Sequence, residues 1–465
     1  MKTHIIAFVI GLLIVNALVA QNITGQWNGV LKVQGTQLRL VFNINKTETG
    51  FSSTMDSPDQ GAKGIPVTST SFENSNLKLT VSNLGVEYQG TLGNDNIILG
   101  NFKQAGMSFP LNLSKGTVEA EKLSRPQEPK KPYPYLDEEV TFQNTKAGIK
   151  LAGTLTLPSK NGNFPAVILI SGSGAQNRDE EIMGHKPFLV LSDFLTRNGI
   201  AVLRFDDRGT AASTGDFKTA TSVDFASDVE AGVAYLQTRK EIDQKKIGLI
   251  GHSEGGIIAP MVASNSKDIS FIVLLAGTGI SGDKLLLLQE DLIFKASGMS
   301  DNKLQIIKRI NSLVFELVKK SNSVDQLTAD LTTFLKQEVK NYPDKPGNIS
   351  DDDFVKAQVS EVVNPWMLNF IKYDPATALA KVKCPVLAVN GAKDLQVPPK
   401  ENLEAIKTAL LKGGNTKVTT IEFPGLNHLF QECKTGLPAE YSTIEQTFSP
   451  IAMSDILKWI QMQTK

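Results

Sequence analysis

The spacing of apolar residues changes character along this chain. Up to about residue 115, apolar and polar residues alternate in short runs separated by Gly, Asn and Asp, with no helical period. Successive side chains of a strand point to opposite faces, so such runs predict strands with one buried face. The runs lie at 25–33, 37–45, 77–82, 86–92 and 96–102. Residues 21–115 are therefore predicted to form a small antiparallel β-domain, either a barrel or a sandwich.

A different pattern begins after a boundary at residues 116–135. Four prolines lie there among charged residues, which favours a stiff, extended linker: Pro126, Pro129, Pro132 and Pro134. From residue 136 to the end, short apolar runs alternate with helical periods. Predicted strands lie at 141–157 (one or two), 166–170, 200–205, 246–250, 270–276, 386–389 and 418–423, and predicted helices at 225–236 and 451–462. This alternation predicts an α/β domain with a doubly wound, mostly parallel sheet.

One long stretch of the second domain contains no convincing strand. Residues 280–375 show helical periods, for example at 303–319 and 324–340. An insertion of this length between two sheet strands predicts a helical cap over the carboxyl edge of the sheet. Asp351, Asp352 and Asp353 are interpreted as a helix start, with acids at the positive end of the helix dipole, and not as a metal site.

The first twenty residues are predicted to be a secretory signal peptide. Lys2 is followed by an unbroken apolar stretch at 5–15 and small residues at 17–20, which indicates cleavage after Ala20 and export to the periplasm or out of the cell. A retained membrane anchor is the alternative. No later stretch reaches the roughly 18 apolar residues that a spanning helix needs, so the mature protein is expected to be soluble.

Charge and cysteine content narrow the function classes. Forty-eight basic residues balance forty-eight acidic ones, so no electrostatic case exists for binding nucleic acid or an anionic membrane. The expected partner is a small, uncharged or weakly charged molecule.

The two cysteines are too far apart for a disulfide. Cys384 and Cys433 lie at opposite ends of the strand that follows Cys384, about 17–20 Å apart for five or six extended residues, so two free thiols are expected.

The chemistry centres on the sequence Gly-His-Ser-Glu-Gly-Gly at 251–256. It lies between the predicted strand 246–250 and an apolar run at 257–263 that suits a buried helix, although Pro260 confines or kinks that helix. Strand, G-x-S-x-G and helix form the context of a nucleophile elbow, in which small residues flank a serine held out at the carboxyl edge of a sheet. Ser253 is therefore the candidate nucleophile. The alternative is a glycine-rich turn whose serine merely caps the helix.

A serine nucleophile needs a base, and the mature chain has only three histidines. His428 is the candidate, because its turn-rich loop directly follows the strand 418–423 at a carboxyl end of the sheet. His252 adjoins the serine but should point away from it, so a structural role is expected. His185 is expected to be a pocket or surface residue.

The carboxylate that orients the base is expected in a loop after the preceding strand. Asp394 follows the strand 386–389, and the chain order Ser253, Asp394, His428 is that of α/β-hydrolases. Asp206 and Asp207 follow an earlier strand and adjoin Arg208, so a structural ion pair is expected there.

Two backbone N–H groups are needed for the oxyanion of the tetrahedral intermediate. Glu254, directly after the nucleophile, is expected to supply one. The other is expected from the loop at 171–174, which follows the strand 166–170, with Ser173 as the choice and Gly174 as the near alternative.

From residue 136 onward the chain resembles the α/β-hydrolase superfamily. More narrowly, it is similar to secreted bacterial carboxylesterases and serine-aminopeptidase-like hydrolases with a small β-rich amino-terminal domain. The resemblance is carried by the segments 170–174, 205–209, 251–256, 390–394 and 425–428. Two departures are a serine in place of the usual histidine in the loop at 171–174 and a missing second glycine at 209–213. The resemblance implies a helical cap and hydrolysis of short-chain esters.

The leading hypothesis is thus a serine carboxylesterase that works through an acyl-enzyme, with no metal or cofactor. Trp366, Met367 and Phe370 are candidates for lining an acyl pocket, although ordinary packing of the cap explains them equally well. An aminopeptidase is the alternative within hydrolases, with Glu361 and Asp374 as candidates for holding the substrate's amino group. A non-catalytic binding protein on the same fold is the alternative from another class.

Overall fold

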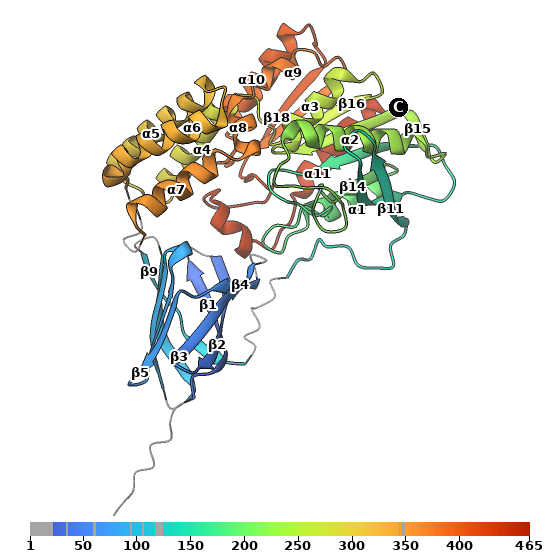
Figure 1. Cartoon of the computed structure of the whole chain (residues 1–465). Coiled ribbons are helices and arrows are strands. Elements are labelled where there is room, and N and C mark those ends of the chain that lie inside the picture. Colours follow the sequence, from blue (N-terminus) through green and yellow to red (C-terminus); the bar gives the residue numbers. More distant parts are fainter. Residues whose placement is uncertain are drawn as a thin grey trace, which may run out of the picture.

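A computed structural model describes residues 22–33, 36–58, 62–93, 95–104, 107–116, 124–343, 345 and 349–465. The predicted signal peptide and the part of the predicted linker at 117–123 lie outside these residues. The described chain comprises a β-domain, an α/β domain and a set of cap helices (Figure 1).

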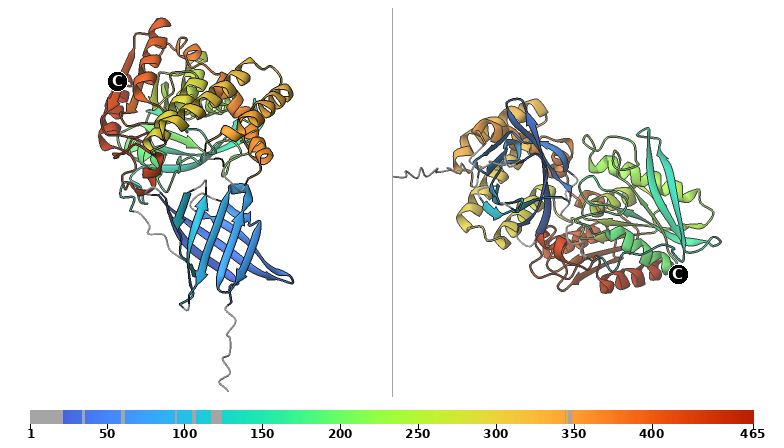
Figure 2. Two further views of the ribbon diagram at one scale, coloured as in Figure 1. Left: turned by 90° about the vertical axis from the view of Figure 1, so that its left-hand side faces the viewer. Right: turned by 90° about the horizontal axis from the view of Figure 1, so that it is seen from below.

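The β-domain is one antiparallel sheet of ten strands, paired in the order β4-β3-β2-β1-β10-β8-β7-β6-β5, with β9 on β8. The strands are β1 (Gly25–Val33), β2 (Thr36–Thr47), β3 (Gly50–Ser57), β4 (Ala62–Pro66), β5 (Ser69–Glu73), β6 (Asn76–Val81), β7 (Val86–Leu92), β8 (Ile97–Gln104), β9 (Met107–Pro110) and β10 (Leu113–Lys115). The sheet is strongly curled (Figure 2). Its apolar core includes Trp27, Phe42 and Tyr88. All five strands predicted in this region are present.

The α/β domain contains a mixed sheet of eight strands in the order β11-β12-β14-β13-β15-β16-β17-β18. Its strands are β11 (Leu136–Asn144), β12 (Ile149–Leu157), β13 (Phe164–Ile170), β14 (Ala201–Phe205), β15 (Ile242–His252), β16 (Phe271–Leu275), β17 (Val386–Gly391) and β18 (Val418–Phe423). The six strands β13 to β18 pair with one another in parallel, whereas β11 and β12 are antiparallel to their neighbours. The parallel strands β14, β16 and β17 are buried along their whole length because helices cover both faces.

Two apolar cores lie on the two faces of this sheet. On one face, side chains of α2 (Ser222–Gln237), α3 (Gly255–Asn265) and α10 (Pro399–Lys412) pack against the strands, and the short α9 (Ala376–Leu379) joins them. On the other face, α1 (Pro187–Arg197) and α11 (Pro450–Gln463) do so. The carboxyl ends of the parallel strands are left open for the loops that carry the candidate chemistry.

Among the described residues between β16 and β17, five α-helices lie in the stretch that is predicted to form a cap, drawn yellow to orange in Figure 1. They are α4 (Gly282–Ala296), α5 (Asp301–Lys320), α6 (Val324–Glu338), α7 (Asp351–Val362) and α8 (Pro365–Lys372). The cap has its own apolar core, built around Ile310, Leu331 and Ile371. Asp351 begins α7, and the hydroxyl of Ser350 accepts the N–H of Asp353, so the three acids form a capped helix start as predicted.

The end of the linker forms hydrogen bonds with two segments of the α/β domain, one between β13 and α1 and one between β18 and α11. The guanidinium of Arg125 donates to the backbone carbonyls of Met183, Gly184 and Ile444. The side chain of Gln127 bonds the backbone of residues 447 and 448 at three points. The strand β2 of the β-domain lies against the short 3-10 helix η4 (Pro438–Thr443). Both attachments therefore involve the segment between β18 and α11.

Cys384 and Cys433 are both free thiols. Within the part of the chain that the structure describes, no helix combines the length and the apolar character needed to span a bilayer.

Candidate active site

Ser253 lies in the tight turn between β15 and α3. Its φ is 52°, in the left-handed region, and its backbone N–H donates to the carbonyl of Leu275 at 2.9 Å. A Cβ on Gly251 would lie 2.0 Å from the carbonyl oxygen of Gly255, and one on Gly255 would lie 2.2 Å from that of Ile170. Only glycine fits at these positions, so the sequence pattern around Ser253 is explained by the closeness of the turn to its neighbours.

Asp394 and His428 are joined by a buried hydrogen bond of 2.7 Å between Oδ2 and Nδ1. Asp394 follows β17 and His428 follows β18, two adjacent parallel strands, so both side chains lie at the carboxyl edge of the sheet. The other oxygen of Asp394 accepts the backbone N–H groups of Gln396 and Val397, each at 2.8 Å. The carboxylate is therefore held by three donors, and it holds the Nδ1 side of the imidazole.

His252 brings His428 next to the serine turn. The two imidazole centroids are 4.8 Å apart, and Nε2 of His252 lies 3.0 Å from the carbonyl oxygen of His428. Among the residues that the structure describes, no hydrogen bond joins the hydroxyl of Ser253 to His428. Such bonds are often long or misaligned before substrate binds.

The loop at 171–174 approaches the serine turn from β13. A Cβ on Gly172 would lie 3.2 Å from that of Ser253, and the N–H of Gly172 donates to Oε1 of Glu180 at 2.6 Å. Within the described chain, the N–H groups of Ser173, Gly174 and Glu254 donate to no protein acceptor. An oxyanion donor needs an N–H group without a protein acceptor, and the predicted role of Ser173 and Glu254 as such donors stays a prediction.

The side chain of Glu254 links the serine turn to the cap. Its Oε1 accepts the hydroxyl of Ser222 at 2.6 Å and the indole N–H of Trp366, in α8, at 2.8 Å. The carboxyl is almost completely buried, and burial raises its pKa. Trp366 stacks on Phe370, whose ring packs against Ile257 of α3 in a small core between cap and sheet domain.

Met367 packs instead on the core of the cap. The three candidate pocket residues therefore lie at or near the contact between α8 and α3, and their predicted role in binding an acyl group stays a prediction.

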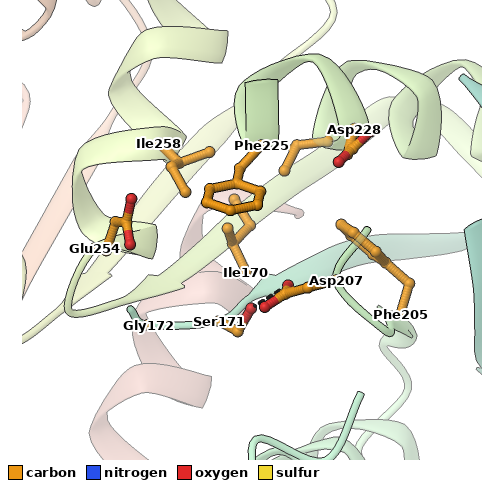
Figure 3. A pocket seen from close by; sticks show the side chains of 10 residues that line it. Ile170, Ser171, Gly172, Phe205, Asp207, Phe225, Asp228, Glu254 and Ile258 are labelled. Carbon is orange, nitrogen blue, oxygen red and sulfur yellow. Dashed lines mark hydrogen bonds between the residues drawn. The ribbon is translucent and has the colours of Figure 1, made fainter. Parts of the chain in front are cut away.

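A small hollow lies behind the serine turn, between the sheet and helices α2 and α3 (Figure 3). Glu254 and Asp207 border it on different sides, with Ile170, Phe225 and Ile258 among its lining residues. Asp207 has no cationic partner among the described residues; it accepts the hydroxyl of Ser171 at 2.7 Å and the N–H of Gln176 at 2.9 Å. Burial raises the pKa of Asp207 to about 7 despite these two donors.

The structural ion pair expected for Asp206 is present, with Arg178 as its partner at 2.8 Å. Arg208 pairs with Asp228 of α2 at 2.7 Å, so the same expectation is wrong for Asp207, which has no cationic partner among the described residues. The prediction for His185 is also wrong. His185 is neither in a pocket nor at the surface. It is fully buried and bonds Thr447 and the carbonyl of Tyr441, because the segment after β18 folds back over it.

The two candidate acids for an amino-group clamp lie outside this cluster. Asp374 accepts the N–H of Ala376 at the start of α9, and Glu361 is exposed at the end of α7. In the described ranges, no group of His, Cys, Asp and Glu side chains has the arrangement of a metal site.

Glu180 is the residue that sequence reasoning missed. It lies in an irregular segment between β13 and α1 and binds both His252 and Gly172, although it is 72 residues from His252 in the sequence. No motif marks it, and only the path of the loop brings it to the site.

Known proteins with similar sequences include hydrolases of thioesters and esters. The family model "BAAT / Acyl-CoA thioester hydrolase C terminal" matches residues 229–433, a segment that contains Ser253, Asp394 and His428. Esterase EstD of Thermotoga maritima is 24% identical over 297 residues, which make up 63% of this chain and 61% of the relative. The chain thus spans less than two thirds of the length of that relative.

Two further matches are looser. An uncharacterized 31.7 kDa protein of Escherichia coli is 24% identical over 281 residues, 59% of this chain and 87% of its own length. The solved esterase Pf2001 of Pyrococcus furiosus aligns with 75% of this chain and 96% of its own at 17% identity and a TM-score of 0.40, too loosely to carry an argument. The family model covers β15 to β18, the strands that hold the serine turn, the acid and the histidine in the mixed sheet, so over this segment the chain is similar to acyl-CoA thioester hydrolases.

Proposed function

We propose that this protein is a serine hydrolase that cleaves carboxylic esters through an acyl-enzyme. The observation that carries the proposal is the hydrogen bond between Asp394 and His428, at the sheet edge where Ser253 is held at positive φ. Ester hydrolysis is further supported by the match to an acyl-CoA thioester hydrolase family model and by the similarity to Esterase EstD.

In the proposed reaction, Nε2 of His428 accepts the proton of the Ser253 hydroxyl as Oγ attacks the ester carbonyl. Asp394 keeps the proton on Nδ1, so that Nε2 is free to act as the base. The N–H groups of Glu254 and Ser173 bind the oxyanion of the tetrahedral intermediate. The alcohol leaves with the proton from His428, and His428 then takes a proton from water, which attacks the acyl-enzyme and releases the acid.

We propose a short acyl chain for the substrate, which the resemblance to secreted carboxylesterases implies. Trp366, Met367 and Phe370 remain the candidates for contact with that chain. Thioesters are a second substrate class to test, because the matching family model is described by thioester hydrolysis.

A fluorophosphonate probe tests the proposal on the full-length protein. We expect labelling of Ser253, loss of labelling in Ser253→Ala, and labelling of His428→Ala slowed by about 10³-fold or more, because the hydroxyl loses its base. Exposed Ser297→Ala serves as the control and should react like the parent. Absence of labelling in the parent protein would refute the serine hydrolase.

The substrate class is tested by rates on p-nitrophenyl esters of graded acyl length, an acyl thioester and aminoacyl anilides. We expect the highest kcat/KM for a short-chain ester. Faster hydrolysis of an aminoacyl anilide would favour the peptidase instead.

We also propose that the protein is exported, with residues 1–20 removed. Mass spectrometry of the full-length chain expressed in cells and purified from the cell fractions should then give Gln21 as the first residue.

A further inference from the structure

Glu180 and His252 form a buried pair directly behind the proposed catalytic groups. Glu180 is 3% exposed and His252 is 6% exposed, and Oε1 of the acid lies 2.9 Å from Nδ1 of the imidazole. Burial alone would lower the pKa of His252, but Glu180, the carbonyl of His428 and the charge of Asp394 together raise it. Since desolvating two ionisable groups is costly, such a pair contributes little to stability by itself. Its role is therefore indicated by the groups that it binds.

On one side, the pair binds the loop at 171–174, which carries the proposed oxyanion donor Ser173 and is named the oxyanion loop for that reason. Oε1 of Glu180 accepts the N–H of Gly172 at 2.6 Å as well as the bond with His252. Gly172 lies against Ser253 and immediately precedes Ser173. The contact therefore fixes the distance of the loop from the serine, and it occupies the N–H of Gly172 while that of Ser173 stays free.

On the other side, the pair binds the backbone of His428, the proposed base. Nε2 of His252 lies 3.0 Å from the carbonyl oxygen of His428. A carbonyl only accepts, so Nε2 carries a proton and donates it. A further proton then lies between Nδ1 and Glu180, and whichever of the two atoms holds it, the bond between them is kept. Through one carboxylate oxygen and one imidazole, the pair thus connects the oxyanion loop with the backbone of His428. Since His252 directly precedes Ser253, the serine turn is connected to both.

The backbone at Glu180 supports a specific role for this residue. Its φ is 50°, which is uncommon for a residue other than glycine or asparagine, and its N–H donates to the carbonyl of Asn177 at 2.9 Å. Strained residues of this kind persist where the surroundings hold them firmly, and they gather at functional sites.

We propose that Glu180 and His252 are positioning residues, which hold the base His428 and the oxyanion loop at the distances from Ser253 that the reaction requires. Neither touches the reacting atoms, and neither exchanges a proton with the substrate. The inference rests on the proposed function, because it concerns the reaction of Ser253.

Two substitutions of His252 separate its contacts. Asn places an amide near the position of Nδ1 and loses the donor to His428, whereas Gln places an amide near Nε2 and keeps that donor. We expect His252→Asn to lower kcat on a p-nitrophenyl ester by about 10- to 100-fold with KM changed by less than about 3-fold, because small displacements of catalytic groups act on the transition state. His252→Gln should recover most of this loss.

Glu180→Gln should show the same loss in kcat. The neutral amide does not stabilise a second proton on the imidazole as a carboxylate does, and when Nδ1 is unprotonated the amide must turn its NH2 group toward it and release the N–H of Gly172. Glu181→Gln, the exposed neighbour, is the matched control and should leave kcat and KM unchanged. Rates are divided by the fraction of folded protein, measured by circular dichroism, so that unfolding is not mistaken for mispositioning.

Two results would overturn the inference while the parent protein remains active. One is a kcat within about 2-fold of the parent for both His252→Asn and Glu180→Gln, and the other is an equal loss in His252→Gln and His252→Asn. Failure of the parent to react with a fluorophosphonate would instead refute the proposed function, and this inference with it.

Discussion

At the scale of single residues, the site is built from groups held in unfavourable states by their surroundings. Ser253 has a left-handed backbone, Glu180 has another, and Asp207 is a carboxyl without a cation in a place where burial raises its pKa to about 7. Each costs folding free energy, and each lies within the shell around the serine turn. Asp207 offers a direct measurement of such a cost.

Replacing Asp207 by Asn should change how stability depends on pH. The folded pKa of Asp207, about 7, lies above the value of about 3.9 in an unfolded chain. Between these values the folded protein binds a proton that the unfolded chain has lost, so the free energy of unfolding falls as pH rises from about 4 to about 7. Asn does not titrate, and its amide can still pair with Ser171 and Gln176.

Urea unfolding at pH 5 and pH 7.5 checks this expectation. The stability of Asp207→Asn relative to the parent should rise by about 2–3 kcal/mol between the two pH values. Parallel pH profiles for the two proteins would contradict the assignment of a raised pKa to Asp207.

At the scale of elements, the contact between α8 of the cap and α3 below it is polar as well as apolar. Trp366 donates to the buried Glu254, and Phe370 packs on Ile257. This contact joins the cap directly to the helix that begins after Ser253, so the stability of the cap and the geometry of the serine turn are linked through α3.

Trp366→Phe should weaken that contact. Phenylalanine keeps a ring to stack on Phe370 but removes the indole N–H, leaving Glu254 with Ser222 as its only side-chain donor among the described residues. We expect the free energy of unfolding to fall by about 1–2 kcal/mol, the usual effect of losing a buried hydrogen bond. Thermal unfolding measures it, and an unchanged midpoint would show that the bond is not formed in solution.

The elements that sequence reasoning found are those with strong apolar periodicity. The sheet strands of the α/β domain and the helices α2, α5, α6 and α11 lie where they are predicted, within a few residues. The prediction lacks β3, β4, β5, β9 and β10, which are short or rich in serine, threonine and glycine. They are strands because neighbouring strands pair with their backbone, which is a tertiary effect.

At the scale of the whole molecule, the end of the linker helps to hold Asp394 in place. Gln127 bonds the backbone of Thr447 and Phe448, and the same segment contributes Tyr441, whose hydroxyl accepts a bond from Gln396 at 2.8 Å. Gln396 in turn donates its backbone N–H to Asp394. A chain of contacts thus runs from the end of the linker to the proposed triad.

Gln127→Ala should therefore destabilise the α/β domain more than a change at a neighbouring linker residue. Three hydrogen bonds to backbone groups are lost, which predicts a fall of about 1–3 kcal/mol in the free energy of unfolding. Lys130→Ala, at an exposed position of the same linker, is the matched control and should have no measurable effect. Thermal unfolding of both variants makes the comparison, and equal midpoints would argue against an anchoring role.

The sequence by itself determined the alternation of strands and helices, the cap, the glycine-flanked turn of Ser253 and the placement of Asp394 and His428 after successive strands. These features depend on local periodicity and on residues close in sequence, such as Gly251 and Gly255, which the tight turn requires. Only the tertiary structure decided that Arg208 pairs with Asp228, that His185 is buried and that Glu180 reaches His252. Such contacts join segments far apart in the chain, and they depend on the path of irregular loops, which no periodicity encodes.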